Sequence, residues 1–536
     1  MSAPAHARES GAVEMAPGRR RGSASRGEIV AYGALVAVAL VLRLIDLGER
    51  PYHHDESQDA YFSWILLTNG DYEYDPLLHG PLRFYLTAAI LAVLGDTDFT
   101  ARLAPVLMGT AMVALAWGLR PLTGRIAAFV VAVLLAVGPS YLYFSRFARE
   151  DIYIACLTLA LLVVVFRLLD RPRPWQPAAV GALLAASFAT KESTYITCFV
   201  FGTFLLAWLV TDLVRGRRDL VARLALGRRA WLSMLGAFAV VYLLLFTTFG
   251  TALDHWDGLW EGLDYWLGQH DVGRGGEAWF FYIVILALEE WPVLVLGAIG
   301  AWAAWRRPTP LAAFCVWGFV VSLAVYSWAG EKFAWLVLHP LLPLIVLSGL
   351  GVQYLWRSPR AGVRRAGAAV TVVAGFYVVL ASWWVNAEHR TDPRELLVST
   401  QSAEDVLGIR DRVLALAERR VSAGGPPLTV TVDTSQGATF PWAWYFRDLE
   451  SVSYVDLSLP GTASPGSDVL VATDASRQRL APELAGYEAR QFGFRVWWVR
   501  DYGPLGPVSA LEWIATREPW NETGGMPAWL LVRRGA

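Results

Sequence analysis

The sequence predicts a mainly α-helical, polytopic membrane protein: a bundle of about eleven transmembrane helices followed by an α/β domain outside the membrane. Three observations support this fold class. Of the 536 residues, 55% are hydrophobic and only 17% are charged, whereas soluble domains carry about 25% charged residues. Short arginine-rich clusters separate long apolar runs, and these runs stop at about Asn386. The formal net charge of −1 gives no reason to expect a nucleic-acid partner.

Residues 1–27 are polar and arginine-rich, and we interpret them as a cytoplasmic N-terminal tail. The apolar run from about Ile29 to Leu47 is long enough to cross a bilayer. Because no small-residue cleavage pattern follows it, we predict a retained helix rather than a signal peptide. This helix opens a transmembrane domain over residues 28–385.

The arginine clusters also predict the topology, because short arginine-rich loops stay in the cytoplasm. The segment Pro81–Gly95 is apolar but only about 15 residues long, and counting it as a span would place the later clusters outside. We therefore expect a helix at the outer interface there. The N-terminus is then cytoplasmic and the C-terminal domain, residues 386–536, is extracytoplasmic. The predicted spans cover residues 28–47, 101–119, 125–145, 152–169, 176–190, 194–214, 230–250, 279–304, 310–328, 333–355 and 366–385.

This topology gathers charged side chains on the outer face of the membrane. Asp55 and Glu56 directly follow the first span, and carboxylates at membrane depth are costly and usually mark a site. Taken alone, the pair fits a solvated loop equally well, but further clusters on the same face favour a site. These clusters contain His54, His79, Arg102, Arg146, Arg149, Glu150, Asp151, Lys191, Glu192, Glu331 and Lys332, and the loop 251–278 adds Asp254, His270 and Asp271.

Lysine is the rarest of the charged residues. The chain contains only Lys191 and Lys332, and each lies beside a glutamate at the outer end of a predicted span. A lysine ammonium is a compact cation that binds phosphate as a point charge. The alternative is a pair of neutralised loop charges, and the repetition on one face favours a site.

Several functional classes find no support. No ring of acidic residues, inverted repeat or phosphate-binding glycine-rich loop is present, so a pore, a transporter of the inverted-repeat type and a nucleotide site are not indicated. An activated substrate would then come from the membrane. Cys156, Cys198 and Cys315 lie in apolar runs and are interpreted as core residues, without disulfide or metal spacing.

In the C-terminal region, residues 404–421 have helical spacing of apolar residues. Short β-rich runs follow at Leu428–Val432, Val452–Leu457, Val469–Thr473 and Phe494–Val499. This pattern predicts a small α/β domain. The segment 440–445, Phe-Pro-Trp-Ala-Trp-Tyr, is unusually aromatic, which fits core or interfacial packing or, alternatively, a platform for sugar rings or a lid over the membrane site.

Five motifs follow one another in the first 200 residues: Asp55-Glu56, Leu78-His79-Gly80-Pro81-Leu82, residues 99–105 (Phe-Thr-Ala-Arg-Leu-Ala-Pro), residues 143–151 (Tyr-Phe-Ser-Arg-Phe-Ala-Arg-Glu-Asp) and residues 189–193 (Ala-Thr-Lys-Glu-Ser). In this order they resemble the GT-C class of membrane glycosyltransferases over about residues 28–385, in particular glycosyltransferase family 39 and the protein O-mannosyltransferases. The His-His-Asp-Glu motif together with the aromatic segment is most similar to a branch named as flippase-associated in archaeal N-glycosylation. Gly80 departs from the resemblance, because the common pattern has proline there.

The resemblance implies an integral membrane glycosyltransferase. Such an enzyme transfers a sugar from a polyprenyl-phosphate-linked donor to a protein, lipid or glycan acceptor on the outer face. In this interpretation Asp55 is the general base, and Glu56 orients the acceptor or helps to bind a metal. Glu150 and Asp151 would hold a divalent cation, Mg²⁺ or Mn²⁺, with Asp55. The other implied substrate-binding residues are Arg102, Arg146, Arg149 and Lys191 for the lipid phosphate, and His54, His79, Glu192, Glu331 and Lys332.

An alternative from a different class is a non-catalytic translocase of lipid-linked sugars, or a flippase-associated accessory protein. It would use the same carboxylates and cations to bind a headgroup. A glycosyltransferase consumes its lipid donor in detergent, whereas a translocase requires two leaflets and binds without transfer.

Overall fold

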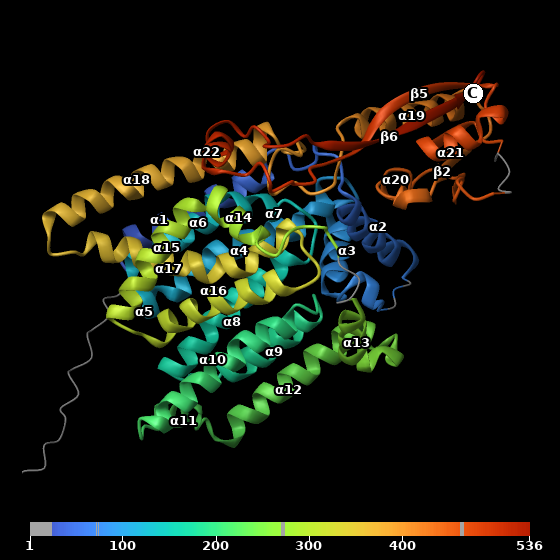
Figure 1. Ribbon diagram of the computed structural model, residues 1–536. Helices are drawn as coiled ribbons and strands as arrows, with labels where there is room; N and C mark the ends of the chain where they lie inside the picture. The colour runs from blue at the N-terminus through green and yellow to red at the C-terminus, as the bar shows by residue number, and fades with distance from the viewer. Residues whose placement is uncertain (1–23, 71, 73, 270–273, 461–465) are drawn as a thin grey trace, which may run out of the picture.

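The computed structural model of the chain describes residues 24–70, 72, 74–269, 274–460 and 466–536. Most of the predicted cytoplasmic tail 1–27 lies outside the described residues, as do His270 and Asp271 of the predicted outer loop. The membrane part is a bundle of helices, and a sheet-containing domain lies at one end of it (Figure 1).

Within the described chain, eight helical segments are long and apolar enough to span a membrane, or nine if α14 (Phe281–Leu288) and α15 (Trp291–Arg306) form one span. These two helices meet at an angle of 96°. The polytopic helical fold predicted from the sequence is therefore confirmed. The other eight segments are α1 (Arg26–Leu44), Thr100–Thr123, which contains α4 (Leu103–Leu115) and α5 (Arg120–Thr123), α8 (Asp151–Asp170), α10 (Thr194–Val214), α12 (Gly227–Phe246), α16 (Pro310–Trp328), Ala334–Trp356, which contains α17 (Leu338–Trp356), and Ala361–Glu388, which contains α18 (Ala361–Trp383).

Three apolar helices have 13 residues each: α3 (Leu82–Leu94), α6 (Arg125–Val137) and α9 (Gln176–Phe188). At 1.5 Å per residue each is about 20 Å long, less than the roughly 30 Å hydrocarbon core. The helix α3 is the segment expected at the outer interface. The count of eleven spans includes α6 and α9, so it stays a prediction.

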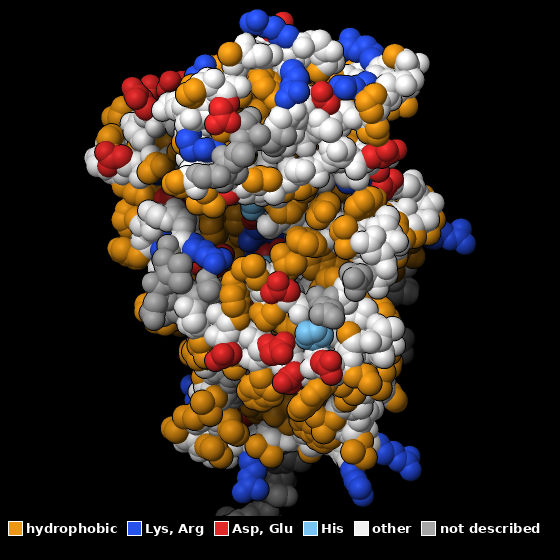
Figure 2. Space-filling model, turned by 90° about the vertical axis from the view of Figure 1, so that its right-hand side faces the viewer, with side chains coloured by type: hydrophobic (Ala, Val, Ile, Leu, Met, Phe, Trp, Pro, Cys, Tyr) orange, Lys and Arg blue, Asp and Glu red, His pale blue; other side chains and the backbone are white. Residues whose placement is uncertain are grey.

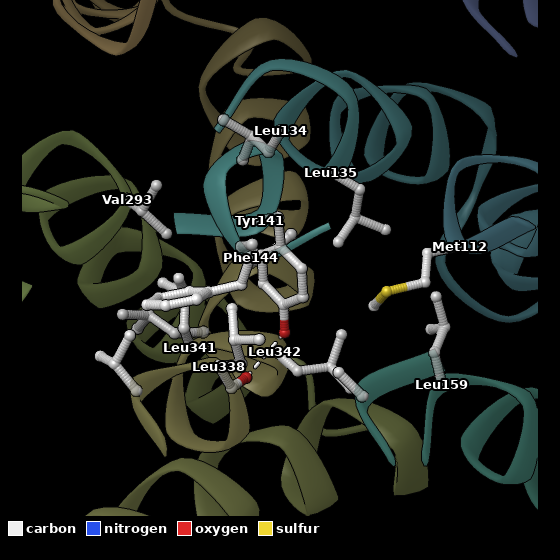
Figure 3. Close-up of a cluster of buried hydrophobic side chains, with 14 of the residues drawn as sticks. Met112, Leu134, Leu135, Tyr141, Phe144, Leu159, Val293, Leu338, Leu341 and Leu342 are labelled. Atoms are coloured by element: carbon white, nitrogen blue, oxygen red, sulfur yellow. Dashed lines mark hydrogen bonds between the residues drawn. The ribbon is translucent and has the colours of Figure 1, made fainter. Parts of the chain in front are cut away.

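The predicted span 125–145 is broken in two, because α6 ends before Gly138 and α7 (Pro139–Phe144) begins with a proline. The two halves pack with α4, α8, α15 and α17 into the apolar core of the bundle (Figure 3). In this core the Tyr141 hydroxyl donates a hydrogen bond of 2.7 Å to the carbonyl of Leu338. This contact satisfies a buried polar group and joins α7 to the first turn of α17.

Several segments that carry arginine clusters lie at the end of the bundle opposite the sheet. Figure 1 shows α5, α11 (Asp219–Leu224) and the turn into α18 at this end, whereas α2 (His54–Asn69), α3 and the sheet lie at the other. The charge pattern therefore placed these loops together correctly.

The C-terminal domain contains a six-stranded sheet in the order β1-β5-β6-β4-β2-β3. The strands β2, β3 and β4 are parallel, and β1, β5 and β6 pair antiparallel. The predicted helix is α19 (Asp405–Ser422), and the three middle strands fall where predicted. The sequence prediction missed β1 and β6 and started β5 seven residues late. The strands are β1 (Gln401–Ser402), β2 (Val430–Asp433), β3 (Val452–Val455), β4 (Val469–Thr473), β5 (Tyr487–Trp497) and β6 (Gly524–Arg533).

The aromatic segment 440–445 attaches this domain to the bundle, as its packing interpretation predicted. Trp442 and Trp444 are fully buried. The Trp444 indole donates a 2.7 Å hydrogen bond to Asp98, and the Tyr445 hydroxyl accepts one of 2.8 Å from the backbone N–H of Tyr52. Tyr52 directly precedes the His-His-Asp-Glu motif, so this attachment holds the start of α2.

A second attachment comes from α22 (Pro507–Thr516), which returns from the sheet to the bundle. Trp513 is buried and donates to the carbonyl of Arg394 at 3.0 Å. The guanidinium of Arg517 lies 2.8 Å from Glu289 at the bend between α14 and α15. The domain therefore contacts the bundle at two places, on either side of the outer end.

Candidate active site at the sheet end of the bundle

The His-His-Asp-Glu motif forms the N-terminus of α2. His53 is the N-cap: its Nδ1 accepts a 3.0 Å hydrogen bond from the Asp55 N–H, and its own N–H donates to Glu56 at 3.1 Å. This reciprocal pair is a capping box. Consecutive helical residues point about 100° apart, so the cap directs Asp55 and Glu56 into different surroundings.

Glu56 is fully buried and forms the centre of a cluster with Arg50 and Arg102, which we call the Glu56 hub. Its oxygens accept hydrogen bonds from both guanidinium groups at 2.9 to 3.2 Å, and from the N–H groups of Ala148 and His53 at 3.1 Å. Burial alone would raise the pKa of Glu56, but Arg102 and Arg50 lower it to about 2. Glu56 is therefore ionised, and both of its carboxylate oxygens already accept hydrogen bonds from the protein.

Asp55 belongs to a second group, which we call the Lys191 network: Asp55, Arg149, Glu150, Asp151 and Lys191. The side chain of Asp55 is 25% exposed and forms an ion pair with Arg149. The Arg149 guanidinium lies 3.9 Å from the centre of the Trp335 ring, a cation–π arrangement. Asp55 is therefore partly exposed to solvent, and the cationic side chain beside it is held in place by Trp335.

Glu150 and Asp151 begin α8 and surround the only lysine of this network. The Lys191 ammonium lies 2.9 Å from Asp151 and 3.1 Å from Glu150. Arg149 adds contacts of 3.3 Å to both carboxylates. Burial would raise the pKa of Glu150, but Arg149 and Lys191 hold it well below its usual value, so this carboxylate is ionised.

His79 extends the network toward the outer interface. Its two ring nitrogens lie 3.2 Å from Glu150 and 2.7 Å from Glu192. These two carboxylates outweigh the effect of burial and raise the pKa of His79 above its ordinary value. His79 is thus set up to carry a positive charge near neutral pH.

Packing explains why position 80 is glycine and not the proline of the common pattern. Its N–H donates to the carbonyl of Thr190 at 3.1 Å, and a Cβ at this position would come within 2.2 Å of the backbone of Ala189. Proline has a Cβ and no N–H, so it fits neither requirement. Gly80 therefore lets the His79 loop approach the loop that carries Lys191.

Figure 2 shows a face of the molecule that is hollowed near its centre, with basic (Lys or Arg) and histidine side chains visible inside the recess. The partly exposed carboxylate of Asp55, with the cations Arg149 and Lys191 in the same network, can bind an anionic headgroup and accept a proton.

Some predicted residues lie elsewhere. Arg102 is fully buried and its guanidinium is engaged by Glu56 and by the carbonyls of Leu47 and Arg50, at 3.0 and 2.9 Å. Arg146 donates to the carbonyl of Asn386 at 2.9 Å. These contacts favour a positioning role for both arginines, because Arg102 is enclosed by Glu56 and backbone carbonyls and Arg146 contacts a backbone carbonyl outside the Lys191 network.

Glu331 lies close enough to Lys191 to help raise the pKa of that ammonium, behind the larger effects of Asp151 and Glu150. Lys332, in contrast, contacts none of the Lys191 network within the described residues; it donates to the carbonyl of Ala329 and lines a separate cavity. His54 contacts Arg495 at 3.2 Å and Phe440 of the C-terminal domain. Burial and Arg495 lower the pKa of His54 to about 4, so it is neutral at pH 7.

Sequence reasoning missed three residues of this region. Arg83 bridges Asp59 and Glu150 at 3.2 Å each, and His339 lies 3.5 Å from Asp151. Asp59 lies one helical turn after Asp55, a spacing that was visible in the sequence. Arg83 and His339 were visible only as single polar residues in apolar helices.

The predicted divalent cation does not fit this arrangement. Among the described residues, no group of three or more His, Cys, Asp or Glu side chains gathers in a form suited to a metal ion. Glu150 and Asp151 are instead neutralised by Lys191 and Arg149, which occupy the oxygens that a cation would bind.

An apolar pocket extends into the bundle beside this site. It lies among α8, α10, α16 and α17, and it ends on Tyr326 and His339, whose rings stack at 4.9 Å. Because His339 also contacts Asp151, the cavity joins an apolar interior to the Lys191 network.

These features define a polytopic helical bundle with a charged site at the end that carries the sheet domain. A family model described as dolichyl-phosphate-mannose-protein mannosyltransferase matches residues 78–246, the part that contains His79, Arg149 and Lys191. No curated protein sequence matches the chain significantly.

Solved structures agree on the fold. ArnT from Cupriavidus metallidurans bound to undecaprenyl phosphate is similar with a TM-score of 0.62 and 16% identity, over 95% of this chain and 98% of that chain. The oligosaccharyltransferase AglB from Archaeoglobus fulgidus, in complex with an inhibitory peptide and a dolichol-phosphate, gives 0.52 and 12%, over 78% and 63%. The arabinofuranosyltransferase AftD from Mycobacteria gives 0.52 and 14%, over 96% and 40%.

Proposed function

We propose that this chain is an integral membrane glycosyltransferase that transfers a sugar from a polyprenyl-phosphate-linked donor to a protein, lipid or glycan acceptor on the outer face of the membrane. The mannosyltransferase family match and the fold shared with ArnT and AglB support this function. The apolar cavity that ends beside Asp151 supports a lipid-linked donor, because an isoprenoid chain is apolar and its phosphate would lie close to Lys191.

The observation that carries the proposal is the exposure of Asp55. Its side chain is 25% exposed, whereas those of Glu56, Glu150 and Asp151 are at most 1% exposed. A general base must reach the acceptor proton, and Asp55 is the carboxylate of this group that an acceptor can approach.

The transfer then takes one displacement at the anomeric carbon. The acceptor hydroxyl oxygen forms the new bond to this carbon while the bond to the phosphate oxygen breaks, and the phosphate leaves with the electron pair. Asp55 takes the acceptor proton. Arg149 and Lys191 stabilise the charge on the departing phosphate, because fixed cations in a water-poor site act strongly on developing charge.

The test is the consumption of a lipid-linked sugar, such as polyprenyl-phosphate-mannose, by the purified protein in detergent. We expect wild type to consume the donor and Asp55→Asn to lose this activity while it still binds undecaprenyl phosphate. Donor binding without consumption by wild type would contradict the proposal and favour the translocase.

We also propose that the N-terminus is cytoplasmic and the C-terminal domain extracytoplasmic, from the arginine distribution. A variant without Cys156, Cys198 and Cys315, carrying one new cysteine within 121–124 or 430–440, reports the side by labelling of intact cells. Labelling of a cysteine within 121–124 from outside the cell would show that the proposed topology is inverted.

A further inference from the structure

A second cavity lies where the C-terminal domain meets the bundle, and we call it the junction cavity. The bundle and the residues after α18 and β5 all contribute to its lining, which includes Glu277, Lys332, Phe333, Thr400, Trp497 and Arg500. The cavity is separate from the apolar one, which lies among membrane helices and shares none of its lining residues.

The junction cavity contains an excess of positive charge. Arg500 is paired with Glu277 at 2.5 Å, and the Tyr502 hydroxyl also donates to Glu277. Lys332 is only 7% exposed, and within the described residues it has no carboxylate partner, only the carbonyl of Ala329. A buried ammonium without a counter-charge is costly, so an anionic group on a ligand would stabilise it.

Aromatic side chains connect this cavity to the general base. Phe333 lines the cavity and stacks on Trp335, with ring centres 4.5 Å apart. Trp335 in turn lies under Arg149, the partner of Asp55. Trp335 is 2% exposed, and its indole N–H has no acceptor within the described residues.

The backbone makes a second connection. The Nε2 of His53 lies 3.0 Å from the carbonyl of Ser399, which lines the cavity, while its Nδ1 accepts from the Asp55 N–H. The next residue, Thr400, has a φ of +41°, a strained conformation of the kind that occurs at ligand sites. The cavity wall and the base are therefore positioned by one histidine.

We propose that the junction cavity binds the acceptor, and that the acceptor is a carbohydrate with an anionic group, a phosphate or a carboxylate. The faces of Phe333 and Trp497 suit sugar rings, and Lys332 pairs with the anion. This inference rests on the proposed function, because it assigns the second substrate of the same transfer.

The two lysines of the chain provide matched variants. Binding of mannose 6-phosphate, glucuronate and neutral mannose is measured by calorimetry in detergent, for wild type, Lys332→Met and Lys191→Met, and undecaprenyl phosphate binding is measured in parallel. We expect wild type to bind at least one of the two anionic sugars more tightly than mannose; comparison of the two identifies the anion. Lys332→Met should weaken this binding about tenfold or more, because it removes a charged hydrogen bond.

The control variants separate this effect from unfolding and from donor binding. Lys332→Arg should retain binding, Lys191→Met should weaken only undecaprenyl phosphate, and Trp497→Ala should weaken the sugars. If wild type binds neither anionic sugar, or if Lys332→Met weakens undecaprenyl phosphate instead, the acceptor assignment is overturned. If donor consumption is absent while anionic sugars still bind through Lys332, the proposed transfer fails and the binding site stands.

Discussion

Asp55 and Glu56 are neighbours in the sequence, yet they lie in two regions with opposite uses of charge. In the Glu56 hub, two arginines and two backbone N–H groups saturate a carboxylate with no exposure. In the Lys191 network, Asp55 stays 25% exposed and is held through its ion pair with Arg149. Adjacent carboxylates of one motif can therefore have different roles: Glu56 positions the helix, and Asp55 is accessible to a substrate.

The largest effect is expected for Asp55→Asn. The substitution preserves size but removes the basic oxygen, and the loss of a general base costs about 10²- to 10⁴-fold in rate. Turnover of the lipid-linked donor measures this loss, and the melting temperature should change little. Full activity of the variant would remove Asp55 from the role of base.

Glu56→Ala should act on stability instead. It leaves Arg50 and Arg102 buried without their counter-charge, which costs about 3–5 kcal/mol. A large fall of the melting temperature in detergent is the readout, and Glu49→Ala, at an exposed carboxylate nearby, is the control. A stable but inactive Glu56→Ala protein would place Glu56 in the chemistry after all.

Acid should weaken the Glu56 hub selectively. The folded-state pKa of Glu56 is about 2, below its ordinary value of 4.5, so its contribution is present above about pH 4.5 and is lost as the pH falls toward 2. The full contribution is about 3 kcal/mol. Melting temperatures between about pH 6 and about pH 3 should fall less steeply for Glu56→Gln than for wild type, and identical slopes would contradict the assignment.

Lys191→Met should have a smaller effect on activity and act mainly on donor binding; it should also lower the melting temperature, because Glu150 and Asp151 lose a buried counter-charge. Loss of one charged hydrogen bond to the phosphate should weaken undecaprenyl phosphate binding about 10- to 100-fold. Arg146→Met is the matched control, because that guanidinium contacts the backbone of Asn386 rather than the network. Equal weakening by both variants would return Arg146 to the phosphate site.

The smallest effect is expected at the attachment of the C-terminal domain. Tyr445→Phe leaves the buried N–H of Tyr52 without its acceptor, which costs about 1–2 kcal/mol. The motif at the start of α2 should then loosen, as faster hydrogen exchange of residues 52–56 would report. An unchanged exchange rate would mean that the cap at His53 holds α2 alone.

The residues of this candidate site could be predicted from the sequence, because charges at membrane depth are expensive and their rarity makes them visible. Asp55, Arg149, Glu150, Asp151 and Lys191 were all recognised from their position at the outer ends of predicted spans. Their division into a hub and a network was not predictable, because it depends on which face of α2 each side chain occupies.

Where the structure differs from the sequence prediction, the difference has a physical reason. Arg102 pairs with Glu56 rather than with a substrate because the chain folds back over 46 residues to bring them together. Lys332 was grouped with Lys191 by their common Lys–Glu context, but the backbone places it in the junction cavity. The strand β6 was missed because Gly524, Gly525 and Pro527 interrupt its apolar pattern.

The position of β6 determines the order in which the strands of the sheet can associate. In the sheet, β6 lies between β5 and β4, although it comes last among the strands along the chain. The strands β2, β3 and β4 can associate as soon as they have been made, but β5 cannot join them until β6, which ends at Arg533, has formed between β5 and β4. Because all six strands follow the described membrane helices in the chain, the sheet is completed only after those helices have been synthesised.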